Sequence, residues 1–71
     1  MFMSREKVDL IKKIYPKGTV VVLDHMDDPY SPPMGTKGTV THVDDIGQIH
    51  VDWENGSSLA LNTDVDSFHT A

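Results

Sequence analysis

Cysteine is absent from this 71-residue chain, so no disulfide can staple the fold and no thiolate can bind a metal. Such a composition is typical of proteins in a reducing compartment. No apolar run approaches the roughly 20 residues that a membrane-spanning helix needs. The N-terminus also lacks the apolar middle region of a signal peptide. We therefore expect a cytoplasmic protein with no membrane association.

Positive charge is scarce as well. Six Lys and Arg residues stand against eleven Asp and Glu residues, which gives a net charge of −5. Four of the six lie close together near the N-terminus, at Arg5, Lys7, Lys12 and Lys13. A protein that binds the phosphate backbone of a nucleic acid needs clustered Lys and Arg to displace counterions. We therefore expect no direct nucleic-acid binding.

The clearest structural pattern covers residues 35–61 and predicts three antiparallel strands joined by two tight turns. Residues 49–53, IHVDW, alternate apolar and polar side chains, which places three apolar groups on one face of a strand. The pair Asn55-Gly56 is typical of a type I′ hairpin turn, because both residue types tolerate positive φ. Residues 58–61 resume the alternation and predict the third strand.

The first turn of this meander, residues 44–47, has a glycine at its end. Counting back from this turn places His42 opposite Ile49 on the neighbouring strand. Side chains alternate between the two faces of a sheet. This register therefore predicts that His42 and His50 lie on opposite faces, which counts against a metal ion shared between them.

The N-terminal segment predicts a short amphipathic helix. We expect residues 1–3 to be loose, Ser4 to be the N-cap, and residues 5–15 to be helical, with apolar residues at every third position from Val8 to Ile14. Such a helix can dock a partner or a membrane surface, or it can cap one open end of a small barrel. We favour the second interpretation, because so short a helix needs tertiary packing to persist.

The first strand, residues 19–23, does not choose its own buried face. Its apolar side chains form an unbroken run, so either Val21 and Leu23 or Val20 and Val22 point inward. The pair left outside forms an exposed apolar strip. Such a strip is typical of a covered sheet edge or of a self-association surface. The alternative is that the N-terminal helix of the same chain covers it.

Residues 24–34 form the most distinctive segment, DHMDDPYSPPM. Its three prolines fix φ and remove backbone donors, so it is neither a central strand nor a helix. The resulting loop is long but stiff, and it presents His25, Met26, Tyr30 and Met34. Long ordered loops in compact domains often carry function. The alternative is that Tyr30 and Met34 fold back as a lid on the sheet, and the sequence leaves both interpretations open.

The C-terminal segment completes the predicted sheet. Residues 62–66 predict a short turn whose Val65 side chain fills part of the core. Residues 67–69 predict a last strand with the side chain of Phe68 pointing inward. Five short strands, a long loop after the first and a short turn before the last are typical of an SH3-like small barrel. The chain is then mainly β, a barrel of about five antiparallel strands with a short N-terminal helix.

This architecture divides the chain into an N-terminal helix, residues 1–15, and a β-barrel domain, residues 16–71. The predicted core consists of the apolar residues on the inward strand faces: Val40, Ile49, Val51, Trp53, Leu59, Leu61 and Phe68.

Several stretches of the sequence resemble a known family: YPKGT, HMDDPYSPPMGTKGTV, VDDIGQIHVDWENGSSLAL and DVDSF. They are similar to a small bacterial domain family known as domain of unknown function 4314, over residues 15–68. The resemblance implies an SH3-like fold and an origin in Gram-positive bacteria, their prophages or conjugative elements. It supplies no catalytic residues. It also favours Val21 and Leu23 as the inward pair of the first strand.

No motif in the chain carries catalysis. The four His residues and eleven carboxylates suggest a metal site, but no spacing matches a zinc or EF-hand signature. The adjacent pairs Asp27-Asp28 and Asp44-Asp45 lie in predicted turns, where such residues usually hydrogen-bond to the backbone. We therefore expect no enzymatic activity, no bound metal and no cofactor.

The sequence favours a binding module that docks a protein partner through an acidic, proline-rich loop and the 44–47 turn. Electrostatic complementarity indicates a partner with a basic surface. The candidate binding residues are His25, Asp27, Asp28, Tyr30, Met34, Asp44 and Asp45.

Two other function classes remain open at this point. One is a module associated with nucleic-acid machinery, since similar small barrels occur in translation and transcription factors. The other is a small-ligand binder or minimal enzyme with sites between subunits, which requires a defined homo-oligomer.

Overall fold

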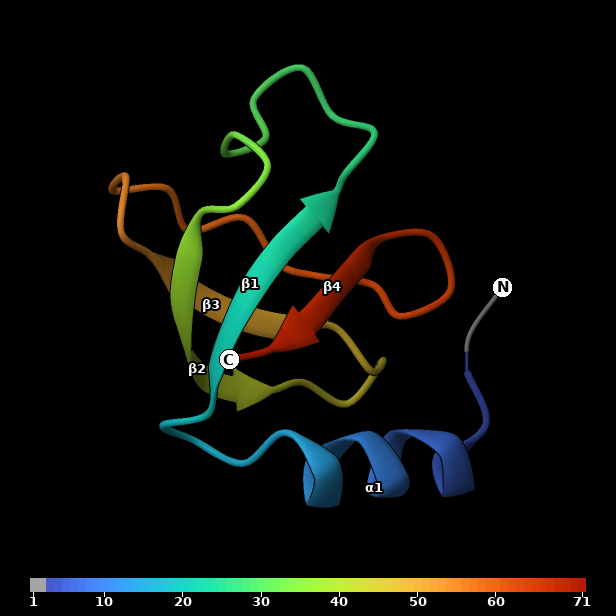
Figure 1. Ribbon diagram of the computed structural model, residues 1–71. Helices are drawn as coiled ribbons and strands as arrows, with labels where there is room; N and C mark the ends of the chain where they lie inside the picture. Colours follow the sequence, from blue (N-terminus) through green and yellow to red (C-terminus); the bar gives the residue numbers. More distant parts are fainter. Residues whose placement is uncertain (1–2) are drawn as a thin grey trace.

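The computed structural model describes residues 3–71; Met1 and Phe2, which we expected to be loose, lie outside this range. Met3 was expected to be loose as well, but it is partly buried and packs against the core. The elements are α1 (Arg5–Ile14), β1 (Val20–His25), β2 (Lys37–Val43), β3 (Ile49–Trp53) and β4 (Ser67–Thr70). The strands form one open antiparallel sheet in the order β3-β2-β1-β4. In Figure 1 the helix lies beneath the sheet, and the loop between β1 and β2 projects from the opposite end.

The start and end of α1 follow from local chemistry. Ser4 is the N-cap, as predicted, and its Oγ accepts a hydrogen bond from the backbone N of Lys7 at 3.2 Å. The helix ends at Ile14, one residue earlier than predicted. Pro16 disfavours helical φ and ψ at the residue before it, and Tyr15 accordingly has φ −120° and ψ 66°.

One face of α1 packs on the sheet. Val8 and Ile11 are buried, which confirms that the helix covers its own domain. The buried stripe is narrower than predicted, because Leu10 and Ile14 remain 55% and 52% exposed. Within residues 3–71, no helix has both the length and the apolar character needed to cross a bilayer.

The structure settles the orientation of β1. Val21 and Leu23 are 0% and 1% exposed, whereas Val20 is 40% exposed. The family resemblance favoured this pair, and that expectation is confirmed. The strand also continues to His25, so the first two residues of the predicted loop belong to the sheet.

The hairpin of β2 and β3 corrects the predicted register. Val40 pairs with Val51, but His42 pairs with His50 rather than with Ile49. The cause is a register shift between Val40 and His42, which places an extra residue in β2. Such an irregularity leaves no clear mark in a sequence. It places the two histidines on the same face of the sheet rather than on opposite faces.

The turn after β3 differs from the predicted type I′ turn. Gly56 has φ 88°, but Asn55 is not in the positive-φ region. Gly56 N donates to Trp53 O at 2.9 Å, and Trp53 N donates to Ser57 O at 3.0 Å. This is the pattern of a type I turn followed by a glycine bulge, the usual three-residue hairpin loop.

The third strand of the predicted meander is reduced to a single bridge between Ile49 and Leu61. Side chains bind the backbone groups that a strand would use for its ladder. The indole Nε1 of Trp53 donates to Leu59 O at 2.9 Å, and Leu59 N donates to Ser57 Oγ at 3.3 Å. The described residues therefore form a sheet of four strands rather than five.

The segment before β4 is a hydrogen-bonded turn, as predicted, but it does not plug the core. Val65 is 69% exposed, so its predicted role is wrong. The apolar anchor is instead Phe68 in β4, whose ring lies 5.3 Å from the ring of Tyr15. This contact joins the last strand to the end of the helix.

The core lies between the sheet, α1 and the segment that follows β3. Its buried side chains are Val8, Ile11, Val21, Leu23, Val40, Ile49, Val51, Trp53 and Leu61. Five of the seven predicted core residues belong to this set, while Leu59 and Phe68 are only partly buried. Gly38 is also required here, because a Cβ at this position would collide with Val51 and lie 2.7 Å from Trp53 Cε3.

Candidate functional site

The first half of the β1–β2 loop (residues 26–36) is held by Asp28. Its Oδ1 accepts a hydrogen bond from Tyr30 N at 2.8 Å, and its backbone O accepts from Ser31 N at 3.1 Å. This is the Asx-turn geometry for which Asp is favoured. Pro32 is buried and anchors the middle of the loop. The segment is therefore ordered by its own contacts.

The second half of the loop is closed by backbone hydrogen bonds to β1. Gly35 N donates to Leu23 O at 2.7 Å, and Leu23 N donates to Thr36 O at 3.0 Å. Thr36 Oγ1 also donates to Pro33 O at 2.7 Å. These contacts extend the β1–β2 pairing to the base of the loop.

Two large apolar side chains of this loop face solvent, whereas Met26, at its start, is partly buried against the core. Tyr30 is 82% exposed and Met34 is 80% exposed. The interpretation of these residues as a lid on the sheet is therefore wrong. Aromatic and methionine side chains are enriched at the centres of protein interfaces. The loop presents both kinds on a fixed backbone.

The charged groups of the loop play different roles. Asp27 and His25 are exposed, whereas Asp28 is half-buried and engaged with the backbone as described above. Asp24, at the end of β1, lies 2.9 Å from the Nδ1 of His69 in β4. Of the three carboxylates in this region, Asp27 is the one whose side chain makes no hydrogen bond or ion pair within the described residues.

At the opposite end of β2, Asp44 organises the β2–β3 turn (residues 44–47). One carboxylate oxygen, Oδ1, accepts hydrogen bonds from Ile46 N at 3.1 Å and from Gln48 N at 2.9 Å. The other oxygen, Oδ2, lies 2.8 Å from the Nε2 of His50. Both oxygens are therefore engaged in holding the turn.

These contacts change the acidity of Asp44. Burial acts to raise the pKa of this carboxyl, but hydrogen bonds from His50, Gln48 and Ile46 outweigh it. They favour the charged carboxylate and leave the pKa of Asp44 below its ordinary value. The residue is a structural anion, not a group prepared to accept or donate a proton.

The two histidines of this hairpin stack on one face of the sheet. The rings of His42 and His50 lie 4.2 Å apart and are almost parallel, at 6°. The prediction that they face opposite sides is wrong, because of the irregularity in β2. Stacked rings do not aim their nitrogens at a common ion, and within residues 3–71 no group of three or more His, Cys, Asp or Glu side chains converges on a metal position.

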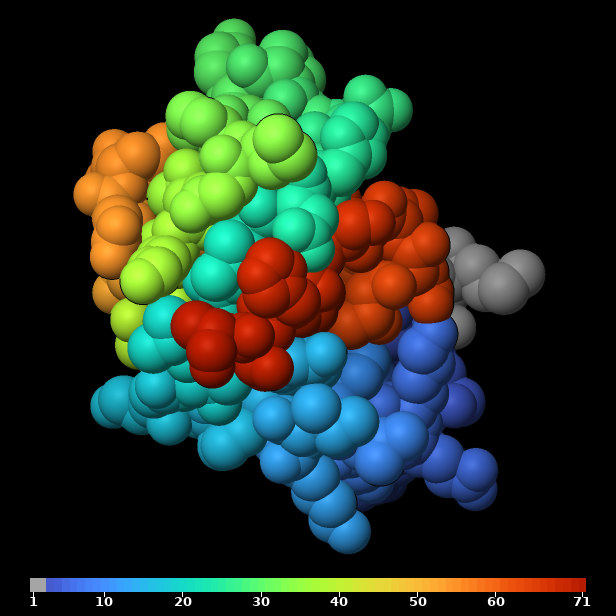
Figure 2. All heavy atoms as spheres, in the orientation of Figure 1, coloured from blue at the N-terminus to red at the C-terminus, as the bar shows by residue number. Residues whose placement is uncertain are grey.

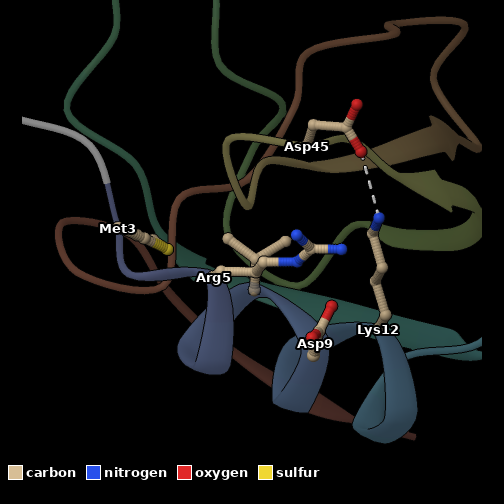
Figure 3. A pocket seen from close by; sticks show the side chains of 6 residues that line it. Met3, Arg5, Asp9, Lys12 and Asp45 are labelled. Atoms are coloured by element: carbon tan, nitrogen blue, oxygen red, sulfur yellow. Dashed lines mark hydrogen bonds and ion pairs between the residues drawn. The ribbon is translucent and has the colours of Figure 1, made fainter.

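Asp45, the neighbouring carboxylate, points toward α1. Its Oδ1 lies 3.2 Å from the Nζ of Lys12, and Figure 3 shows this ion pair bridging the turn and the helix. A hollow of about 390 Å³ opens beside it, and the guanidinium of Arg5 extends into this space (Figure 3). The lining residues are Met3, Arg5, Val8, Asp9, Lys12 and Asp45.

The hollow was not predicted from the sequence. Arg5, Asp9 and Lys12 lie on one stripe of the helix, so the helical pattern contains the signal for their grouping. Its position opposite Asp45 depends on the tertiary packing of α1. The lining carries two positive and two negative side chains, and the hollow therefore has no strong preference for ligand charge.

The seven predicted binding residues do not form one site. His25, Asp27, Asp28, Tyr30 and Met34 lie in or beside the β1–β2 loop, whereas Asp44 and Asp45 lie in the β2–β3 turn. The seven-residue strand β2 runs between the two groups and separates them by roughly 20 Å. Of the two groups, the loop displays the more exposed apolar side chains, with Tyr30 at 82% and Met34 at 80% against 46% for Ile46 in the turn. The loop is therefore the candidate docking site.

Comparison with known proteins assigns the chain to a family without adding a biochemical function. No curated protein and no solved structure matches it. The sequence model of a family described as a domain of unknown function (DUF4314) matches residues 4–71, which is nearly the whole chain. This protein belongs to the DUF4314 family.

Proposed function

We propose that this protein is a non-enzymatic binding module that docks a protein partner through its β1–β2 loop. The observation that carries the proposal is the exposure of Tyr30 and Met34, at 82% and 80%, on a loop fixed by hydrogen bonds and by a buried proline. Binding to an ordered loop avoids much of the entropy loss that a flexible loop would incur. A large aromatic side chain and an adaptable thioether then supply the contact area.

The charge around the loop supports a partner with a basic surface. Asp27 is exposed, and Asp24 and Asp28 add negative charge nearby. The chain as a whole has a net charge of −5, which favours encounter with a basic protein. In this proposal Tyr30 and Met34 supply most of the affinity, while Asp27 contributes mainly to the rate of association.

The architecture is consistent with an SH3-like small barrel, which we propose as the fold relationship. Its support is the connectivity: a long loop after β1, a tight hairpin of β2 and β3, a bridge from Ile49 to Leu61, a short turn, and β4 returning to β1.

The resemblance described above supports a cytoplasmic setting in a bacterium or one of its mobile elements. A partner in host defence or replication fits that setting.

The proposal is tested by affinity capture from a lysate of the native host, using three forms of the tagged protein. The first is the unaltered chain and the second carries Tyr30→Ala with Met34→Ala. The third carries Val65→Ala, which truncates an apolar side chain that is 69% exposed in the turn before β4. We expect the unaltered chain and the Val65 variant to retain the same protein, and the loop variant to lose it by tenfold or more.

A fourth form, Asp27→Lys, separates the electrostatic contribution from the apolar one. We expect slower association, with the largest difference at low salt, since exposed charges act mainly on encounter. Equal retention by the unaltered chain and the Tyr30 and Met34 variant would exclude the loop as the docking site.

A further inference from the structure

β4 is an edge strand, and its outward backbone groups can be identified from the hydrogen bonds of β1. Leu23 donates to Thr36 O at 3.0 Å and accepts from Gly35 N at 2.7 Å, so its peptide groups face β2. Phe68 lies opposite Leu23 in the β1–β4 pair. The N–H and C=O of Phe68 therefore point away from β1, toward the free edge.

Thr70 repeats this arrangement two residues later, because peptide groups alternate in direction along a strand. It lies opposite Val21, whose peptide groups also face β2. Ala71, by contrast, donates inward to Val20 O at 3.0 Å. At its outer edge β4 thus presents the N–H and C=O of Phe68 and of Thr70, with no strand of residues 3–71 beside them.

The edge lacks the usual protection against pairing with another strand. β4 reads Ser-Phe-His-Thr, with no proline and no Lys, Arg, Asp or Glu. Natural edge strands are commonly blocked by such residues or by a bulge. The register shift in this pair lies between Leu23 and His25 of β1, at the start of β4 rather than beside Phe68 and Thr70. The short length of β4 is its one protective feature.

An apolar strip on α1 adjoins this edge. The helix contacts the β4 region at two points, through the Lys7–Asp64 ion pair and the packing of Tyr15 on Phe68. Leu10 and Ile14 follow Lys7 at the i+3 and i+7 positions and therefore lie on the same flank of the helix. Both are more than half exposed. In Figure 2 the C-terminal segment lies next to the chain at the end of the helix, where Tyr15 packs on Phe68.

We propose that β4 pairs antiparallel with β4 of a second copy of this chain, about a two-fold axis at His69. In this register Phe68 of each copy lies opposite Thr70 of the other. The outward donors and acceptors then match one for one and form four interstrand hydrogen bonds, which joins the two sheets into one. The exposed flank of α1, with Leu10 and Ile14, adjoins the same interface and loses water on pairing.

Charge favours a second copy as the occupant of this edge. A chain with a net charge of −5 repels itself over most of its surface. The edge strand carries no Lys, Arg, Asp or Glu, so like-with-like pairing places none of these charges opposite each other. His69, which meets its own copy at the axis, has the carboxylate of Asp24 beside it at 2.9 Å. A symmetric interface also needs a surface that is its own complement. An antiparallel pair of identical edges meets this requirement without any other component.

The inference is independent of the β1–β2 loop and is tested on the purified full chain. Sedimentation across a wide range of concentration should show a reversible monomer–dimer equilibrium. Amide hydrogen exchange should slow at Phe68 and Thr70 as the dimer forms. A protein that stays monomeric at every concentration, with fast exchange at both amides, would overturn the proposal and leave the edge free for an extended segment of another protein. A dimer in which these two amides stay unprotected would also overturn it.

Two neighbouring proline substitutions sharpen the test. Thr70→Pro removes an outward N–H that the chain itself does not use, and two of the four interstrand bonds with it. We expect the association constant to fall at least about tenfold while the monomer stays folded. The matched control, Ala71→Pro, removes the inward N–H that bonds to Val20 instead, and should leave dimerisation unchanged. Equal weakening by both variants would contradict edge pairing.

Discussion

The two ends of β2 use their side chains in opposite ways. In the β2–β3 turn, both oxygens of Asp44 bind groups of the hairpin, and Asp45 pairs with α1. In the β1–β2 loop, Tyr30 and Met34 are large side chains that remain about four-fifths exposed. The turn therefore serves stability, and the loop can change its surface without affecting the fold. A docking site placed on the loop is separable from the core in this way.

The same comparison holds for one backbone feature that both segments share. Gly35 in the loop and Gly47 in the turn have almost equal positive φ, 88° and 86°. Their surroundings differ. A Cβ on Gly35 would have no neighbour within 4 Å, whereas one on Gly47 would lie 2.5 Å from the Sδ of Met3 and 3.4 Å from Val8. The turn is packed under the helix, and the loop stands in solvent.

The largest effect that we predict is for Asp44→Ala. The substitution leaves two backbone N–H groups and His50 without their acceptor. Each such loss lowers stability by about 1 kcal/mol, so we expect a decrease of roughly 2–3 kcal/mol in the free energy of unfolding. For a chain of this size that corresponds to a melting temperature lower by roughly 10 °C or more, measured by thermal unfolding under circular dichroism.

The neighbouring residue provides the control. Asp45 is fully exposed, and its ion pair with Lys12 lies at the surface, where such pairs contribute little. Asp45→Ala should leave the melting temperature unchanged within error. A fall as large as that of Asp44→Ala would show that charge, rather than the hydrogen bonds of the turn, stabilises this region.

Alanine at the two glycines should separate backbone strain from crowding. At both positions alanine is forced into the left-handed region, which destabilises the fold by about 1 kcal/mol. At Gly47 the crowding against Met3 adds to this, so we expect about 1 kcal/mol for Gly35→Ala and about 2 kcal/mol for Gly47→Ala. Urea unfolding of the two variants measures the difference. Equal losses in the free energy of unfolding would mean that Met3 moves away from the added Cβ without lowering stability.

The lowered pKa of Asp44 predicts a pH dependence of the folding stability. A carboxyl whose pKa is lower in the folded chain stabilises the fold above its unfolded pKa, near 3.8, and loses this contribution as pH falls through the folded pKa. The stability difference between the unaltered chain and Asp44→Asn should therefore be constant near neutral pH and shrink in acid, as pH falls past the unfolded pKa near 3.8 and through the lower folded pKa. Thermal unfolding across this range tests it, and a difference that grows in acid would contradict the assignment.

Much of the fold was predictable because its strongest signals are local. The N-cap at Ser4, the helix end before Pro16 and the alternation in IHVDW each act within a few residues. The N-cap and the alternation are found where predicted, and the helix ends within one residue of its predicted end. The errors arise where side chains from distant positions compete with the backbone. The indole of Trp53 binds Leu59 O, so residues 58–61 do not form a full strand.

The candidate site was predictable in part for the same reason. Three prolines and an Asx turn fix the β1–β2 loop locally, and the sequence therefore identifies the loop and its residues. Whether Tyr30 and Met34 fold back or face solvent depends on contacts across the sheet, which the sequence leaves undetermined. The stacking of His42 on His50 depends on one irregularity in β2, and a single-residue shift reverses the faces of a strand.

The smallest effect that we predict is on stability at the proposed docking residues, and it is the sharpest test of the comparison. Tyr30→Ala with Met34→Ala removes two large side chains that are about four-fifths exposed, so the free energy of unfolding should change by less than about 0.5 kcal/mol. Tyr15→Ala is the matched control, since this tyrosine is half-buried and packs on Phe68 at 5.3 Å; it should lose about 2 kcal/mol or more in the same assay. A comparable loss from the loop variant would mean that Tyr30 and Met34 serve the fold. Their exposure would then no longer argue for a partner.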